Sequence, residues 1–464
     1  MEVSSGSAAA VRRREQASSL WKLDNGVVLV PAGAPIPITG TDQFHEFHAH
    51  TEYRFLMGAG TPRAVLAFDP GDGWSLFAPV ANKDERVWEG DDTPLDRIAR
   101  DSGISRVRPL TELRGWLEVR RGESFAVLGN PDLFEHPDRY RLDSLAPLEL
   151  ERDGAGEEQF SQTLSEMRRE KDPWELQRMR LAAAASCAGH LLALRSARSG
   201  MSERRLQVEL EAEFFRIGAE RTAYGSIVGS GSNASILHHP PTERPLGVDD
   251  LVLIDAGAEW DGYASDITRT FPVGRAFKGP QRDLYQLVLD VQEAAIQGVR
   301  PGKEYKELHL EAALSIAGGL VQLGILRGSP QDLVDADAHA IFFPHGLGHM
   351  LGLATHDAGG CLVGRKPSER FGLKWLRLDL PLQEGHVLTI EPGIYFIAAL
   401  IRDPEIRERF RDQVNWERVD EVADVGGIRI EDDVLVTSDV PEILSGGLTK
   451  SVEGIEALRE EAYS

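Results

Sequence analysis

Two aspartates beside a predicted hairpin turn are the first residues of this sequence that suggest chemistry. Residues 251–271 form two apolar runs around an Asp-Gly pair at 261–262, and such a pair favours a tight turn because both positions tolerate positive φ. With this pair as the loop, Asp255 lies opposite Thr268 and shares a sheet face with Asp266, at a diagonal spacing of about 7–8 Å. Two carboxylates between apolar strands are costly to bury without a cation, so we expect a metal site. The alternative at this point is a solvated acidic face of the hairpin.

Two glutamates nearer the carboxyl end also stand in strand-like runs. Glu391 lies in VLTIEPG, where Thr389 shares its strand face and the following Pro-Gly ends the ordered run. Arg429 and Glu431, in GIRIEDD, are likewise two residues apart and therefore point to one side. For any one of these residues, a charge that faces water from an edge strand is the plainer alternative.

Histidines occur in a glycine-rich stretch, PHGLGHMLG, which contains His345 and His349, and His356 follows seven residues later. We expect a loop that leads into a short helix, and a polar surface is its simplest interpretation. Four carboxylates and one imidazole, however, form an oxygen-rich set that suits two hard or borderline divalent ions better than a structural zinc. Manganese is therefore expected first, with cobalt or zinc as substitutes.

A separate group of histidines, His45, His48 and His50, lies in the first half of the chain. The last two would share a strand face. No carboxylate or cysteine cluster nearby completes a tetrahedral set, so we interpret the group as structural.

The elements that must position these residues fall into two regions. From about residue 22 to 150, short β-like runs alternate with polar helical stretches such as 93–102, which predicts an α/β domain with its own sheet. The β-like runs are GVVLVPAG, RAVLAFD, SLFAPV and SFAVLGN. Residues 151–165 are polar and contain glycine, and we interpret them as the linker between domains.

The second region begins with helices. A long helical pattern starts near residue 166, admits Pro173 where the chain enters its next helix, and ends at Gly200. Further helices are expected over residues 201–218, 280–299 and 305–323. The region closes with the two charged β-runs and a short terminal helix.

Composition limits the class of protein. The 464 residues exceed one ordinary core and predict two or three domains. A formal charge of −23 argues against nucleic acid or an anionic membrane as partner. Only Cys187 and Cys361 are present, so no disulfide framework is implied. Neither a secretory leader nor an apolar run of membrane-spanning length is evident, and we expect a cytoplasmic protein.

The ordered motifs IDAG, SDITRTF, HGLGH, TIEPG and GIRIED resemble those of the pita-bread metallopeptidases, most closely prolidase and its relative aminopeptidase P. The resemblance implies a mixed α/β (α+β) protein with an N-terminal domain at 1–160 and a pita-bread catalytic domain at 161–464. It also implies two divalent ions, manganese first, held by five side chains. These are Asp255, Asp266, His349, Glu391 and Glu431.

The same resemblance assigns roles to the metal ligands. Asp266 and Glu431 would bridge the ions, Asp255 would hold one, and His349 with Glu391 would hold the other. Paired ions lower the pKa of a bridging water and polarise the scissile carbonyl, so hydrolysis needs no protein nucleophile. Glu391 would carry a proton from that water to the leaving proline nitrogen.

Other residues are implied at the substrate. His238, His345 and His356 would contact peptide carbonyls and the terminal carboxylate, with His345 and His356 assisting catalysis, and Arg429 would lie on the substrate side or behind the ligands. Support of the ligands is implied for Tyr224, Thr268 and Thr389. Residues 354–357 read ATHD where the family commonly has DVHD, so the histidine is kept and an acidic neighbour is lost.

The expected activity is that of a prolidase, which cleaves Xaa-Pro dipeptides. Arg377, fourteen residues before Glu391, lies where prolidases carry an arginine that clamps the free carboxylate after proline. An ordinary loop arginine is the alternative, because Arg370 and Lys374 are neighbours.

Three other functions stay open. They are an Xaa-Pro aminopeptidase that acts on longer peptides, a prolidase-like organophosphate hydrolase, and a non-catalytic pita-bread module that binds without cleaving. The presence of all five ligands weighs against the last of these. Relatives of this kind are usually homodimers or tetramers, and we expect a homodimer.

Overall fold

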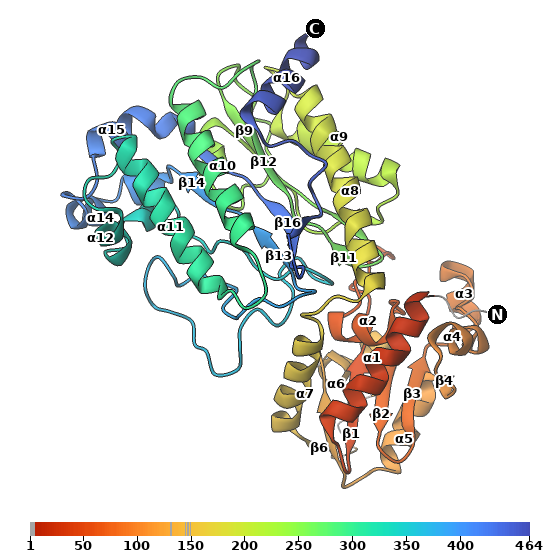
Figure 1. Ribbon diagram of the computed structural model, residues 1–464. Coiled ribbons are helices and arrows are strands. Elements are labelled where there is room, and N and C mark those ends of the chain that lie inside the picture. Colours follow the sequence, from red (N-terminus) through yellow and green to blue (C-terminus); the bar gives the residue numbers. More distant parts are fainter. Residues whose placement is uncertain (1–4, 130–131, 144, 146–147, 149) are drawn as a thin grey trace. The chain divides into compact units, whose positions relative to one another are not determined.

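The computed structural model describes residues 5–464 except 130–131, 144, 146–147 and 149. The chain divides into two units, Met1–Arg168 and Arg169–Ser464 (Figure 1). The domain bounds 1–160 and 161–464 stay a prediction. The expected linker at 151–165 is largely helix instead, because Asp153 caps α7 (Gly154–Met167) by accepting a hydrogen bond from the Gly156 amide at 2.8 Å.

The first unit is built on a mixed sheet of six strands in the order β4-β3-β2-β1-β5-β6. Its strands are β1 (Val27–Pro31), β2 (Val65–Asp69), β3 (Gly73–Ala78), β4 (Val107–Pro109), β5 (Ser124–Val127) and β6 (Glu151–Arg152). All four predicted β-runs are strands. The helices preceding α7 are α1 (Ser5–Trp21), α2 (Thr51–Met57), α3 (Lys83–Glu89), α4 (Leu95–Ser102), α5 (Leu113–Glu118) and α6 (Asp132–Glu135).

The strand expected around the first-half histidines is wrong. His45, His48 and His50 lie in irregular chain just before α2, so the latter two share no strand face. Among the described residues, none of these histidines joins a cluster of metal-ligand type.

Long helices flank the strands of the second unit (Figure 1). They are α8 (Pro173–Ser196), α9 (Glu203–Ile217), α10 (Pro280–Gly298) and α11 (Tyr305–Gln322), followed by the shorter α12 (Pro330–Asp335), α13 (Ala398–Ile401), α14 (Pro404–Arg409), α15 (Trp416–Val422) and α16 (Val452–Tyr463). Pro173 is the first residue of α8, as the sequence pattern predicts. Asp172 caps that helix together with Glu175. No helix in the described part of the chain combines the length and apolar character that crossing a membrane requires.

The strands of the second unit form small antiparallel sheets, ordered β11-β10-β7, β12-β9-β8, β13-β16-β17 and β14-β15. Their bounds are β7 (Arg221–Thr222), β8 (Ile227–Ser230), β9 (Leu251–Asp255), β10 (Ala258–Trp260), β11 (Tyr263–Ala264), β12 (Thr268–Pro272), β13 (Val387–Ile390), β14 (Gly393–Tyr395), β15 (Gly427–Arg429), β16 (Asp432–Leu435) and β17 (Glu442–Ile443).

The hairpin register predicted from the Asp-Gly pair is confirmed. Trp260 pairs with Tyr263, and Asp255 pairs with Thr268. Both loop residues have positive φ, 48° at Asp261 and 81° at Gly262, as a tight turn of this type requires.

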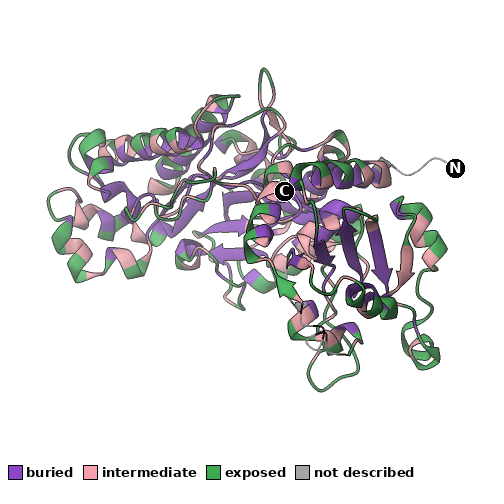
Figure 2. Ribbon diagram, turned by 90° about the horizontal axis from the view of Figure 1, so that it is seen from below, coloured by how far each residue is buried: buried purple, intermediate pink, exposed green. Residues whose placement is uncertain are grey.

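One apolar core joins the long helices to these strands. In Figure 2 most strands are buried and a few short ones are intermediate or exposed, while the helices show both buried and exposed residues. The mixed α/β class is thereby confirmed. Between Ile341 and Val387 the chain, described throughout, has no helix or strand. Cys361 is exposed on this long segment, whereas Cys187 on α8 is partly buried against the core.

Candidate metal centre

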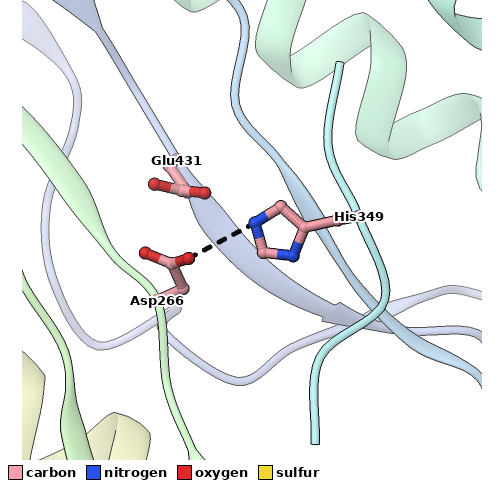
Figure 3. A group of neighbouring side chains, drawn as sticks. All are labelled: Asp266, His349 and Glu431. Carbon is pink, nitrogen blue, oxygen red and sulfur yellow. Dashed lines mark ion pairs between the residues drawn. The ribbon is translucent and has the colours of Figure 1, made fainter. Parts of the chain in front are cut away.

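Three buried side chains from distant parts of the second unit meet at one point. Asp266, His349 and Glu431 each offer a ligand atom, and these atoms all lie within 4.8 Å of one another. The three side chains point toward one another, and the His349 Nε2 atom lies 3.4 Å from an Asp266 carboxylate oxygen (Figure 3). Carboxylates and an imidazole in this arrangement can hold a divalent ion.

His349 is carried by a segment that pairs with β13 rather than by the expected short helix. The Thr389 amide donates to the His349 carbonyl at 2.9 Å, and the Leu351 amide donates to Val387 at 3.0 Å. The Thr389 hydroxyl accepts from the His349 amide at 3.2 Å. Gly348 permits this approach, because a Cβ there would lie 2.0 Å from the Thr389 carbonyl oxygen. Extended pairing therefore fixes the imidazole.

Glu391 lies at the end of β13, beside two imidazoles. Its carboxylate is 3.8 Å from His349 Nε2 and 3.7 Å from His345 Nδ1. The other nitrogen of His345 lies 2.9 Å from the Tyr395 hydroxyl. Glu391 thus joins the cluster on the side of His345.

Asp255 is connected to the cluster through hydrogen-bond donors that also contact other residues of the site. The Tyr224 hydroxyl donates to Asp255 at 2.6 Å and also contacts Asp266. Arg429 donates to Asp255 and, through Nε, to the Thr268 hydroxyl at 3.1 Å. All five predicted ligands therefore lie in one continuous network.

Glu431 is held by the hairpin. The Thr268 hydroxyl donates to its carboxylate at 2.7 Å, and the Glu431 amide donates to the Thr268 carbonyl at 3.1 Å. The support predicted for Tyr224, Thr268 and Thr389 thus corresponds to hydrogen bonds in the structure.

The cluster is short of positive charge. Burial raises the pKa of Glu391 to about 7, and burial together with the neighbouring carboxylates raises the pKa of Glu431 well above its usual value. Burial also raises the pKa of Asp266, against the effect of His349. Among the five carboxylate and imidazole groups, the hydrogen bond of Arg429 goes to Asp255. A divalent cation would restore the balance, so the donor set fits the metal ions predicted from the sequence.

Two of the predicted substrate histidines lie on the wall of a neighbouring cavity. His356 packs edge-on against His349 with ring centroids 4.4 Å apart. His356 and His238 both line a cavity of about 520 Å³ that Asp255 and Asp266 also line. Arg377 is exposed on the long segment. Burial lowers the pKa of His356, and the charges of His349 and Arg377 lower it further.

Sequence reasoning missed two residues of the site. Tyr395 accepts a hydrogen bond from Arg429 at 2.8 Å, and Asp433 accepts one from the Asp266 amide at 3.1 Å. Asp433 lies two residues after Glu431, so strand alternation contained the signal for it. For Tyr395 the only indication was its place in the strand-like run that follows the TIEPG motif, which is a weaker one.

Comparison with known families gives matches along most of the chain. The model described as metallopeptidase family M24 matches residues 177–438, and the model described as aminopeptidase P, N-terminal domain, matches residues 9–124.

Individual proteins are similar over nearly the whole length. The Xaa-Pro aminopeptidase of Escherichia coli is 32% identical over 463 residues, which cover 96% of each chain. A probable Xaa-Pro aminopeptidase of Fusarium vanettenii is 33% identical over 86% of this chain and 84% of its own. Among solved structures, Pseudomonas aeruginosa aminopeptidase PepP has a TM-score of 0.82 at 32% identity over 98% of both chains. Escherichia coli aminopeptidase P with the inhibitor Pro-Leu has a TM-score of 0.81 at 30% identity over 100% of both.

Proposed function

Because the chain belongs to metallopeptidase family M24, we propose that it is an Xaa-Pro aminopeptidase, which releases the first residue of a peptide whose second residue is proline. The matches confirm the resemblance to the prolidase and aminopeptidase P group and the pita-bread fold. The chain is a metallopeptidase, and its substrate class is the proposal.

The relatives favour the aminopeptidase alternative over the dipeptidase that the motifs led us to expect. The observation that carries the proposal is the 32% identity to an Xaa-Pro aminopeptidase across 96% of both chains. One similar structure was solved with Pro-Leu, a peptide that begins with proline and continues. A product of aminopeptidase action has that form, whereas a dipeptidase releases proline alone.

We assign two divalent ions to the five clustered side chains. Asp266 and Glu431 would lie between the ions, Asp255 on one side, and His349 with Glu391 on the other. When bound, such ions lower the pKa of a water and polarise the scissile carbonyl. Manganese stays the expected metal.

Glu391 is the residue we assign to proton transfer. Its carboxyl lies at the edge of the cluster, 3.7 Å from His345, and burial raises its pKa to about 7. In this position the carboxylate would accept a proton from the attacking water and return it to the leaving nitrogen.

Two histidines beside the metal centre have lowered pKa values and are therefore neutral imidazoles near pH 7. Burial, assisted by Arg429, lowers the pKa of His345 to about 3. Burial, assisted by His349 and Arg377, lowers the pKa of His356 to about 4. A neutral His356 can donate one hydrogen bond to a peptide carbonyl without adding charge. In His345 the Nδ1 proton is already donated to the Gly346 carbonyl at 2.8 Å, and Nε2 lies 2.9 Å from the Tyr395 hydroxyl, so this ring would act on the peptide through Tyr395 and Glu391 beside it. We assign His238 to the same wall from its place in the cavity.

The test compares Ala-Pro-Ala with Ala-Pro as substrates in manganese, cobalt or zinc. We expect the tripeptide to have the higher kcat/KM. Arg377→Ala should leave that preference unchanged, because a substrate that continues beyond proline needs no carboxylate clamp beside it. A higher kcat/KM for Ala-Pro that Arg377→Ala abolishes would instead establish a dipeptidase.

A further inference from the structure

The cavity beside the candidate metal centre extends to the first turn of α9. Asp255 and Asp266 line it, and so do Arg204 and Gln207. His238 and His356 line it as well. Its volume of about 520 Å³ leaves room for a side chain beyond the peptide backbone.

Arg204 contributes a guanidinium to the lining of this cavity. Its guanidinium donates to the Gln207 side-chain oxygen at 2.6 Å. The Gln207 amide nitrogen in turn donates to Glu211 at 2.7 Å, which turns the amide oxygen toward Arg204. Within the described residues no carboxylate lies at ion-pair distance from Arg204, although the chain as a whole has a charge of −23. The next residue, Arg205, does pair with a carboxylate, that of Glu209 at 4.0 Å.

The backbone that carries Arg204 is firmly anchored. Glu203 is fully buried, and its carboxylate accepts hydrogen bonds from Ser230, His239 and Thr242, the last through its hydroxyl at 2.7 Å. The Arg204 amide donates to the Thr242 carbonyl at 2.9 Å. These bonds join the start of α9 to the segment that forms one cavity wall, so buried contacts hold the backbone of Arg204 beside the cavity. The side chain itself is exposed, and the hydrogen bond to Gln207 orients its guanidinium.

The place of a bound peptide follows from the candidate metal centre. An aminopeptidase cleaves the bond between the first residue and proline, so that bond must lie beside the ligands of the ions that would polarise its carbonyl. Asp255 and Asp266 are the carboxylates that line this cavity. With the first residue beside them, its side chain lies in the remaining space of the same cavity, which Arg204 also lines.

We propose that Arg204 forms the cationic end of the subsite for the first residue of the peptide and selects an acidic side chain there, glutamate above all. The inference rests on the proposed function. A carboxylate on the substrate would supply the ion-pair partner that the described chain does not give to Arg204, in bidentate geometry.

The experiment measures kcat/KM for Glu-Pro-Ala and for its neutral isostere Gln-Pro-Ala at low ionic strength. Wild type should favour the glutamate peptide by about fivefold, the value of a partly exposed ion pair. Arg204→Gln should lose this preference and Arg204→Lys should keep part of it, while both variants cleave Ala-Pro-Ala as wild type does. Arg205→Gln is the matched control, because it removes the same charge one residue away on the same helix.

Each outcome decides a separate point. The ratio of kcat/KM for Glu-Pro-Ala to that for Gln-Pro-Ala could be the same in wild type and in Arg204→Gln while Ala-Pro-Ala is still cleaved. That result would overturn the role of Arg204 alone. If Arg205→Gln lost the preference for the glutamate peptide to the same extent, the effect would be one of general charge, and the role of Arg204 would be overturned too. Failure of wild type to cleave any of these peptides would overturn the proposed function and this inference with it.

Discussion

Glu391 is largely buried, although a metal ligand at this position must carry a negative charge. Burial raises its pKa to about 7, although His349 and Arg429 act in the opposite direction. A glutamate in an unfolded chain titrates at about 4.3. Between these two values the folded, metal-free protein holds the proton more tightly than the unfolded chain does. The stability contributed by the protonated carboxyl is therefore lost as the pH rises from about 4.3 through about 7.

We expect Glu391→Gln, which keeps the shape of the protonated group, to be increasingly more stable than wild type in metal-stripped protein as the pH rises from about 5 to about 8. Urea unfolding at a series of pH values measures this difference. A difference that does not change with pH would contradict it. In saturating divalent metal the order should reverse, because the variant has lost a ligand.

At the scale of elements, Gly348 allows the histidine segment to lie against β13. A Cβ at this position would approach the Thr389 carbonyl oxygen to 2.0 Å and the Tyr305 hydroxyl to 2.5 Å. Gly348→Ala should therefore push His349 away from the cluster and lower kcat/KM by about a hundredfold, as small misplacements do. Peptide hydrolysis and metal binding by calorimetry measure the loss.

Gly318→Ala in α11 is the matched control. Its Cβ would meet Pro330 at an ordinary distance of 3.6 Å. This variant should keep full activity and gain up to about 1 kcal/mol of stability, since alanine favours a helix. Equal activity in both variants would show that the close approach at Gly348 has no role.

A buried ion pair anchors the segment that carries His356. Lys171 Nζ lies 3.1 Å from the Asp357 carboxylate, and both side chains are 1% exposed. Lys171→Met should destabilise the protein by about 3–5 kcal/mol, because it takes the ammonium away from a buried carboxylate. It should also raise the KM for peptides by loosening His356.

The double variant Lys171→Met with Asp357→Leu should regain much of that stability, since it buries neither charge. Chemical denaturation of the single and double variants tests this coupling. Simple addition of the two single losses would contradict it.

Elements whose signals are local were predictable from the sequence. The Asp-Gly turn determined the pairing of Asp255 with Thr268, and strand alternation placed Arg429 and Glu431 on one side. The conformation at His349 was not predictable, because its partner strand lies forty residues away and glycines allow many conformations. The polar residues that form α7 resembled a linker, because the cap at Asp153 is the local feature that distinguishes this helix from a flexible segment.

At the scale of the whole molecule, the metal centre would connect chain segments that are far apart in sequence. The clustered ligands come from residues 255 to 431, so bound ions hold together the hairpin, the histidine segment and the last strands. A ligand that binds only the folded state at one hundred times its Kd adds about 2.7 kcal/mol of stability.

Removal of metal with a chelator should therefore lower the Tm of the second unit and abolish peptide hydrolysis while most helix signal remains. Calorimetry and circular dichroism measure both effects, and separate additions of manganese, cobalt and zinc identify the ion that restores activity. Full activity after exhaustive chelation would contradict a metal-dependent reaction.

The exposed thiol on the long segment of the second unit offers a built-in reporter. Cys361 is exposed, whereas Cys187 is partly buried, and burial raises the pKa of Cys187 to about 12. Because the chain contains no other cysteine, a maleimide dye at mildly alkaline pH should attach almost entirely at Cys361. Since the Cys361 thiol lies 3.9 Å from the Arg377 carbonyl oxygen, fluorescence of the labelled wild-type chain would report movement of the long segment around Arg377 without any engineered substitution.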